Sequence, residues 1–253
     1  MRFTSLGSGS RGNATVVEAG QTRLLVDCGY TSRELERRLD ALELRGEALS
    51  AILVTHEHAD HVRGVGPVAR RYGIPVWTST GTARAATFGD LPALHLFSAH
   101  AGSFRIGDIE VEPFAVPHDA REPCQFVFTA GSRRFGMLTD AGRITPHIVG
   151  SLRELDALLL ECNHDPDLLA RGPYPPALRA RVGGPLGHLS NDQAAELLRL
   201  LDHGRLAHLV AGHLSEKNNH PELAAAALLA VSTHLGSRLA ILRQDGVSGW
   251  FCL

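Results

Sequence analysis

The sequence predicts an α/β fold in which strands carry polar side chains to one edge of a sheet. The run Ala51–Val54 is continuously apolar, which is typical of a strand that is buried on both faces. It leads at once into Thr-His-Glu-His-Ala-Asp-His at 55–61, and open α/β sheets place their ligand sites just past such strand ends. Capped amphipathic segments alternate with further short apolar runs, which indicates that helices and strands are mixed along the chain.

The bulk composition is that of a globular protein without a membrane span. The chain has 253 residues, 44% of them hydrophobic, which fits one large domain or two small ones. No apolar run reaches the roughly 18 residues that a membrane span needs. The net charge of −2 provides no global field for a nucleic-acid partner. Four scattered cysteines and the lack of a signal-peptide pattern indicate a cytoplasmic protein.

Elements in the first hundred residues are predicted from apolar periods and helix caps. We expect strands at 2–8, 14–18, 23–27, 51–54 and 75–77, and helices at 31–39, 65–72 and 81–86. The glycine-rich turn Ser8–Asn13 leads into a strand and not into a helix, so it is not a dinucleotide-binding fingerprint. It is either a plain hairpin turn or a backbone floor that brings Ser8, Ser10 or Asn13 near a substrate.

The rest of the chain predicts mostly strands up to residue 140 and mixed elements after it. We expect strands at 109–116, 125–130, 135–138, 156–160, 208–212, 238–242 and 249–253, and helices at 190–201 and 221–234. Residues 171–187 are rich in proline and glycine, with a helical turn expected near Leu178. A long loop of this kind inside a compact domain is more often functional than idle.

Several of these strands end in side chains of the types that commonly bind metals. His118, Asp140 and His213 each follow a strand, and four more ligand types stand at 56–61. We assign one divalent ion to His56, His58 and His118, a second to Asp60, His61 and His213, and a bridging role to Asp140. Two adjacent ions would activate a shared hydroxide and hold the attacking and leaving oxygens. Histidine-rich mixed sites accept zinc, manganese or iron.

The same residues carry a resemblance to a known family. The string at 55–61, with His118, Asp140 and His213, resembles the metallo-β-lactamase superfamily, and the resemblance spans essentially the whole chain. Within it, the chain is similar to the YycJ/WalJ-like group in the stretches 5–13, 160–165, 187–191 and 213–219. The resemblance implies one domain over 1–253, folded as a four-layer αββα sandwich with the metals at one edge. It also implies a phosphodiesterase or nuclease, most specifically a DNA exonuclease. Flavodiiron members carry a glutamate where this chain has His58, which disfavours redox iron chemistry.

A second resemblance assigns roles to the two Gly-His-Leu-Ser strings. Ribonuclease Z-like members of the superfamily have a non-ligand histidine in a Gly-His-Ser/Thr motif and a ligand histidine further along the chain. By this resemblance His188 assists the leaving group and His213 binds metal, so Asp60 and His188 are the expected catalytic residues. Exchanged roles, or a structural His188 before the helix at 190, remain alternatives.

Other polar side chains give weaker signals. Glu161 and His164 end one strand on the same edge and either support the ligands or are ordinary polar residues. Four side chains are expected to contact substrate phosphates, against the alternative of solvated surface: Lys217, Arg179, Arg181 and Tyr174. No inserted domain fits this length, so the loop at 171–187 must cover the substrate. The main alternative function is a hydrolase of lactones, thioesters or cyclic phosphodiesters, because a fold does not fix a function. A non-catalytic metal-binding protein is the third reading.

Overall fold

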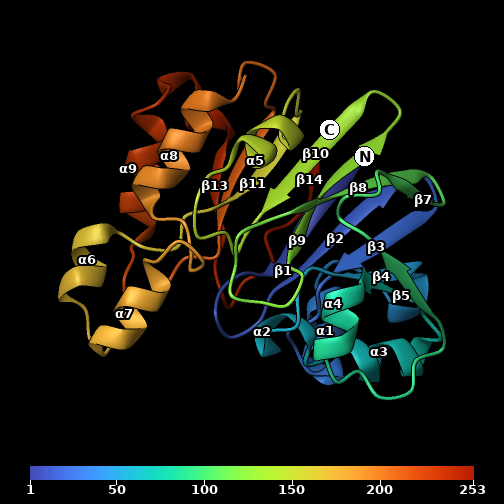
Figure 1. Ribbon diagram of the computed structural model, residues 1–253. Coiled ribbons are helices and arrows are strands. Elements are labelled where there is room, and N and C mark those ends of the chain that lie inside the picture. Colours follow the sequence, from blue (N-terminus) through green and yellow to red (C-terminus); the bar gives the residue numbers. More distant parts are fainter.

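The computed structural model describes residues 1–253 and contains two seven-stranded sheets that pack face to face (Figure 1). The strands of the first sheet are β1 (Arg2–Gly7), β2 (Ala14–Ala19), β3 (Thr22–Val26), β4 (Ala51–Val54), β5 (Val76–Ser79), β6 (Leu94–Phe97) and β14 (Phe251–Cys252). The strands of the second sheet are β7 (Phe104–Ile106), β8 (Ile109–Ala115), β9 (Cys124–Ala130), β10 (Arg133–Leu138), β11 (Ala157–Glu161), β12 (His208–Gly212) and β13 (Leu239–Ile241). Their spatial orders are β14-β1-β2-β3-β4-β5-β6 and β13-β12-β11-β10-β9-β8-β7.

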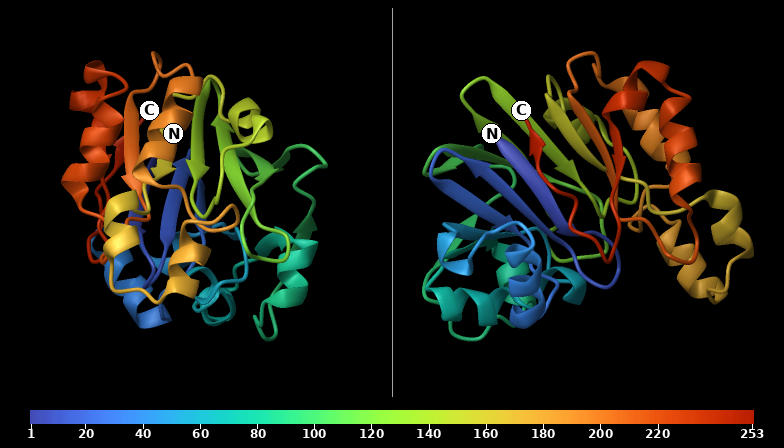
Figure 2. Two further views of the ribbon diagram at one scale, coloured as in Figure 1. Left: turned by 60° about the vertical axis from the view of Figure 1, so that its left-hand side comes forward. Right: turned by 180° about the vertical axis from the view of Figure 1, so that it is seen from behind.

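Helices cover the outer side of each sheet (Figure 2). On the side of the first sheet are α1 (Ser32–Asp40), α2 (Ala59–Val62), α3 (Val65–Tyr72), α4 (Thr80–Ala85) and the 3₁₀ helix Gly46–Ala48. On the side of the second sheet are α5 (Pro146–Ser151), α8 (Asn191–Leu200), α9 (Pro221–Leu229) and the 3₁₀ helix Thr233–Arg238. Two short helices, α6 (Pro166–Arg171) and α7 (Pro176–Val182), project beyond the end of the second sheet. None of these helices has the length and apolar character that crossing a membrane requires.

Apolar side chains fill three layers, one between the sheets and one under the helices on each side. Between the sheets, the fully buried rings of Phe3 and Phe135 stack with their centroids 3.8 Å apart. Leu35 of α1 lies in the layer outside the first sheet, and Leu197 of α8 lies in the layer outside the second. Each fully buried large apolar side chain stabilises the fold by about 1.5–3 kcal/mol. The predicted four-layer αββα sandwich is therefore confirmed.

The parallel half of each sheet brings its strand ends to one edge of the sandwich. Strands β3 to β6 run parallel to one another, as do strands β10 to β13. The inner strand β4 is buried along its whole length, and His56 follows shortly after it. Asp140 follows β10 in the same way, and His213 comes directly after β12. The predicted ligands therefore meet where the carboxyl ends of these strands lie.

Some predicted segments differ from the structure. The continuous helix expected over 221–234 is wrong, because α9 ends at Leu229 and a separate 3₁₀ helix follows. The loop expected at 171–187 contains a complete helix, α7, whose first residue is a proline with a backbone angle preorganised for a helix. Helices α5 and α6 were not predicted, although each follows a capping side chain, Thr145 or Asp165, and begins with proline.

Candidate metal centre

Three imidazoles converge past the end of β4. His56 and His58 come from the loop after β4, and His118 comes from the loop after β8. The Nδ1 atom of His58 lies 3.1 Å from His56 Nε2 and 3.2 Å from His118 Nε2. His56 and His118 are buried, whereas His58 is half-buried. This spacing could hold one metal ion.

Neighbouring groups fix the ring nitrogen that each of these histidines presents. His118 Nδ1 donates to the carbonyl oxygen of Gly187 at 2.9 Å, and because a carbonyl only accepts, the lone pair is left on Nε2. His56 Nδ1 lies 2.9 Å from the hydroxyl of Thr55, so its Nε2 faces the other two rings. Burial holds the pKa of His56 well below its ordinary value, and a neutral imidazole keeps its lone pair for a metal.

Asp60, His61 and His213 form a second group beside the first. Asp60 Oδ2 lies 3.6 Å from His61 Nε2 and 4.0 Å from His213 Nε2. A carboxylate orients each ring: His61 Nδ1 donates to Asp27 at 2.8 Å, and His213 Nδ1 donates to Glu161 at 2.8 Å. Both Nε2 atoms are thereby left to face the group, which is the usual arrangement of carboxylate-supported histidines at metal sites.

The carboxylates around the second group favour positive charge there. Burial alone would lower the pKa of His61, but Asp140, Asp27 and Asp60 outweigh it and raise that pKa to about 9. The pKa of His213 is likewise raised well above its ordinary value, because Asp140, Asp60 and Glu161 together outweigh the effect of burial. A divalent cation bound at this group would replace the protons with its own charge.

Asp140 lies between the two groups. Its Oδ2 is 3.4 Å from His61 Nε2, and its Oδ1 is 3.9 Å from His118 Nε2. Asp140 Oδ2 and His213 Nε2 are both buried without a hydrogen-bond partner. A buried polar atom left unpaired costs about 1–3 kcal/mol, so such atoms normally have partners. A metal ion would satisfy both, and the residues present therefore fit a two-ion centre.

The backbone at three of these positions adopts an uncommon conformation. Asp27, Asp140 and His213 have φ angles of 59°, 55° and 56°, in the left-handed region that residues other than glycine rarely occupy. Each of the three follows a strand, and the sharp turn directs its side chain back toward the site. Such strain costs on the order of 1–3 kcal/mol per residue and is concentrated at functional sites.

His188 lies beside the second group and is bound to Glu161. Its Nδ1 donates to Glu161 Oε1 at 2.8 Å, the same oxygen that accepts from His213. The other oxygen, Oε2, accepts from the backbone N–H groups of Ala141 and Leu189, both at 3.1 Å. One buried carboxylate thus fixes the histidines of both Gly-His-Leu-Ser strings.

A different set of ligands is also close enough to bind a metal, namely Asp140, Glu161, His188 and His213. In this set, however, Glu161 already accepts hydrogen bonds from two imidazoles and two backbone amides. Its pKa lies below the ordinary value, because His188 and His213 outweigh the effect of burial. Its lone pairs are therefore engaged, and the geometry favours His188 as a residue outside the ligand set.

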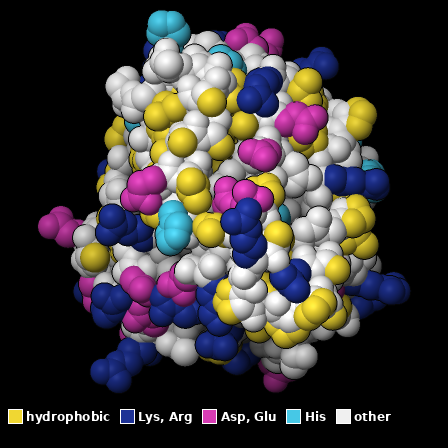
Figure 3. Space-filling view, turned by 90° about the vertical axis from the view of Figure 1, so that its left-hand side faces the viewer, with side chains coloured by type: hydrophobic (Ala, Val, Ile, Leu, Met, Phe, Trp, Pro, Cys, Tyr) yellow, Lys and Arg dark blue, Asp and Glu magenta, His cyan; other side chains and the backbone are white.

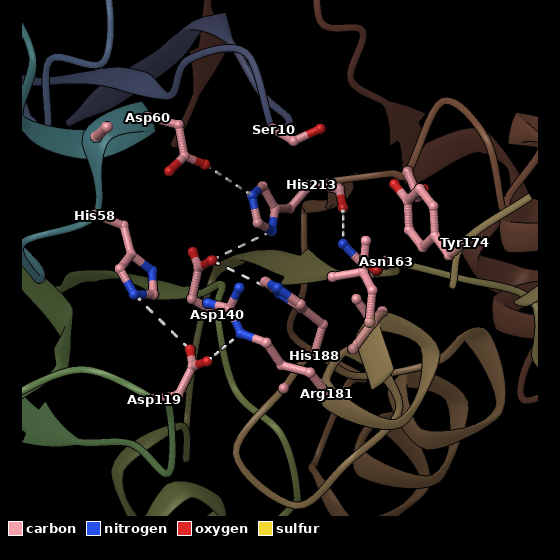
Figure 4. A pocket seen from close by; sticks show the side chains of 15 residues that line it. Ser10, His58, Asp60, Asp119, Asp140, Asn163, Tyr174, Arg181, His188 and His213 are labelled. Carbon is pink, nitrogen blue, oxygen red and sulfur yellow. Dashed lines mark hydrogen bonds and ion pairs between the residues drawn. The ribbon is translucent and has the colours of Figure 1, made fainter. Parts of the chain in front are cut away.

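The two groups open into a hollow of about 360 Å³ (Figure 4). The segment of α6 and α7 contributes part of its lining through Tyr174, Leu178, Arg181 and Val182. Basic, acidic and apolar side chains are interspersed on the face that carries these helices (Figure 3), so no field of one sign marks a path for a polyanion. Substrate recognition must therefore depend on groups in and around the hollow.

Of the four predicted substrate contacts, two line the hollow and two do not. Tyr174 and Arg181 line the hollow. Lys217 does not line it, but its Nζ lies 5.8 Å from the centre of the Tyr174 ring. Arg179 is held by the carbonyl oxygen of Ala170 within the segment of α6 and α7 and does not line the hollow.

Of the two residues predicted to support the ligands, one contacts them and the other does not. Glu161 contacts both histidines as described, whereas buried His164 lies behind Asn163, with 3.3 Å between His164 Nδ1 and Asn163 Oδ1. Asn163 lines the hollow, and its Nδ2 donates to the carbonyl oxygen of His213 at 3.0 Å.

Sequence reasoning missed two residues that shape the centre. Asp27 accepts from His61 and also from the backbone N–H and the hydroxyl of Thr55, at 2.9 and 2.8 Å. Asp119 stands next to His118 and lines the hollow. Asp27 could have been found, because it follows the strand β3 directly, as the candidate ligands follow their strands.

Comparisons with known proteins agree with this geometry. Residues 22–210 match the family described as the β-lactamase superfamily domain. The chain is 36% identical over 227 residues to the exodeoxyribonuclease YycJ of Bacillus anthracis, which covers 88% of this chain and 86% of that protein. It is 36% identical over 229 residues to the exodeoxyribonuclease WalJ of Streptococcus pneumoniae, covering 88% and 85%. The crystal structure of YhfI, a metallo-β-lactamase fold protein from Bacillus subtilis, matches with a TM-score of 0.75 at 16% identity, covering 97% of this chain and 98% of that chain.

Proposed function

The chain belongs to the metallo-β-lactamase superfamily, and from this membership we propose that it is a two-metal phosphodiesterase that degrades DNA from its ends. The observation that carries the proposal is the pair of ligand groups that meet at one hollow, with His188 beside them. The homologous exodeoxyribonucleases align over most of the chain, which supports DNA as the substrate.

We assign two divalent ions, of zinc, manganese or iron, to this centre. The first would be held by His56, His58 and His118, and the second by Asp60, His61 and His213. Asp140 would lie between them. The two buried atoms without partners, Asp140 Oδ2 and His213 Nε2, support this assignment. Ions bound there would lower the pKa of a water molecule and hold the phosphate oxygens.

In the proposed reaction, His188 assists the departing oxygen. Because Glu161 accepts from its Nδ1, the ring is fixed in orientation, and in the protonated imidazolium form its Nε2–H would be the proton given to the departing oxygen. Asp60 lies across Asp140 from His188 in Figure 4, where its carboxylate would orient the attacking water. Acid and nucleophile would then approach the phosphorus from different sides.

Protein purified without a chelator is expected to contain close to two metal ions per chain. Elemental analysis against protein concentration measures this directly. Asp140→Ala should lose at least one ion, because the residue between the two groups is removed. The matched control is Asp167→Ala, an exposed position on α6 that should keep both ions. A preparation that retains activity with no bound metal would contradict the assignment.

To test the function, the protein is loaded with manganese or zinc and incubated with one substrate at a time. The substrates are labelled linear DNA, RNA, lactones, thioesters and a bis-aryl phosphate. We expect DNA cleavage that weakens as salt rises, because binding of a polyanion releases counterions. Turnover of lactones or thioesters with no cleavage of DNA or RNA would favour the small-molecule hydrolase instead.

We further propose that the protein works in the cytoplasm and forms one domain over 1–253. All four cysteines are free and three of them are buried, which suits a reducing compartment. The apolar layer shared by the two sheets supports a single folding unit.

A further inference from the structure

We propose that the hollow is a blind channel closed by the Arg181–Asp119 ion pair, so that only the free end of a DNA strand reaches the metal centre. The inference rests on the proposed exonuclease function and adds the reason why an end is required. The strand would enter past Ser215, and its terminus would stop against the ion pair.

The closed side is built where the chain returns from α7 to the second sheet. Arg181 Nε donates to Asp119 Oδ2 at 2.5 Å. Next to this pair, the backbone N–H of Asp119 donates to the carbonyl oxygen of Leu186 at 3.0 Å, and His118 donates to that of Gly187. Side-chain and backbone contacts thus connect α7 to the loop that follows β8.

This closed side, formed by Arg181, Asp119 and the backbone of residues 185–187, is called the wall below. It extends to the metal-ligand groups on one side and to the second sheet on the other. Asp119 Oδ1 lies 3.8 Å from His58 Nε2, so the ion pair continues into the first group. At the base of the wall, a Cβ atom on Gly142 would collide with the backbone of Pro185, Leu186 and Gly187. Backbone packs directly on backbone here, with no room even for a methyl group.

The opposite side of the hollow adjoins a second hollow. In Figure 4, Ser10 lies across the ligand groups from Asp119 and Arg181. Ser215 lines this hollow and also a second one of about 540 Å³. The second hollow is lined in part by Arg243, an exposed side chain that forms no ion pair within the chain. Its guanidinium is therefore available to a phosphate of the entering strand.

This arrangement bears directly on where the scissile bond can lie. A strand that continues on both sides of the metals must leave the hollow in two directions, and the wall obstructs one of them. The scissile bond must then lie close to a terminus. The Arg181 side chain is 59% accessible and that of Asp119 is 28% accessible, and ion pairs near the surface contribute only about 0–1 kcal/mol. Arg181 can thus be changed without unfolding the protein.

The test compares linear and circular single-stranded DNA of one sequence as substrates for the wild type, Arg181→Ala and Arg171→Ala. Arg171 is a matched control because it lies on the same projecting segment, is exposed, and does not line the hollow. The wild type and the control should cleave linear DNA and leave circles intact. Arg181→Ala should raise the ratio of circular to linear cleavage by at least about tenfold, which corresponds to a barrier lowered by about 1.4 kcal/mol.

Two further measurements separate closure from other roles of Arg181. In the Asp60→Ala background, where DNA is bound and not cut, the linear strand should bind more tightly than the circle, and adding Arg181→Ala should remove that preference. Arg243→Glu should slow cleavage of long strands while sparing a bis-aryl phosphate, which does not reach the second hollow.

The outcomes distinguish a failure of the blind-channel proposal from a failure of the proposed exonuclease function. Cleavage of circles by the wild type, or an unchanged ratio in Arg181→Ala, would overturn the blind channel. Loss of both activities in Arg181→Ala would also overturn it, because Arg181 would then be required for binding. No cleavage of either DNA by the wild type would reject the exonuclease function, and the channel with it.

Discussion

Replacing Asp60 with alanine is expected to lower DNA hydrolysis by about 10³-fold or more, as when a central member of a catalytic unit is removed. Its carboxylate faces His61 and His213 and lines the hollow. The fold should survive, because the contact that anchors this loop uses the backbone of Asp60, whose carbonyl oxygen accepts from the N–H of Asn13 at 2.8 Å. Turnover, circular dichroism and metal content should be measured on the same preparations.

Two variants sharpen the Asp60 experiment. Asp60→Asn keeps the shape of the side chain and removes its charge, so it should be nearly as inactive as Asp60→Ala. Asp167→Ala removes an exposed carboxylate from α6 and should behave as the wild type. If Asp60→Ala turned over DNA at a near-normal rate with both metals bound, Asp60 would have no place in the centre.

The metal-ligand candidates were accessible from sequence because each one follows an apolar strand. His56, Asp140 and His213 stand at the ends of β4, β10 and β12, and parallel strands bring such ends to one edge. Asp27 stands at the end of β3 and obeys the same rule. It was overlooked because a lone aspartate after a strand is common at turns, and its function depends on the ring of His61, 34 residues away.

The supporting contacts join residues that are far apart in the sequence, so no local sequence pattern could predict them. Glu161 connects two histidines that lie 27 and 52 positions further along the chain. The wall of the hollow depends on Arg181 and Asp119, which are 62 positions apart. Proline and glycine in the segment that contains α7 predicted a loop, yet a proline in the first turn is compatible with a helix. The helix has no buried residue, so its sequence lacks the apolar periodicity that would predict a helix.

Replacing His188 with alanine is expected to slow DNA cleavage by roughly 10²–10³-fold while both metal ions stay bound. The reason is geometric: His188 is held by Glu161 and lines the hollow, and His213 is the histidine that we assign to the ligand position in the second group. A group that donates to the departing oxygen matters less when that oxygen leaves easily. The loss should therefore shrink for a nitrophenyl ester of a nucleotide, and comparing the two substrates measures the effect.

Three readouts distinguish the roles open to His188. Loss of one metal ion in His188→Ala would mean that the two Gly-His-Leu-Ser histidines have exchanged roles, with His188 as a ligand. A rate loss of equal size for good and poor leaving groups would indicate that His188 positions the phosphate and does not protonate the leaving oxygen. His100→Ala, at an exposed histidine away from the hollow, controls for general effects of the substitution and should match the wild type. Only retained metals together with a defect that depends on the leaving group identify His188 as the acid, because neither a ligand nor a positioning residue produces both.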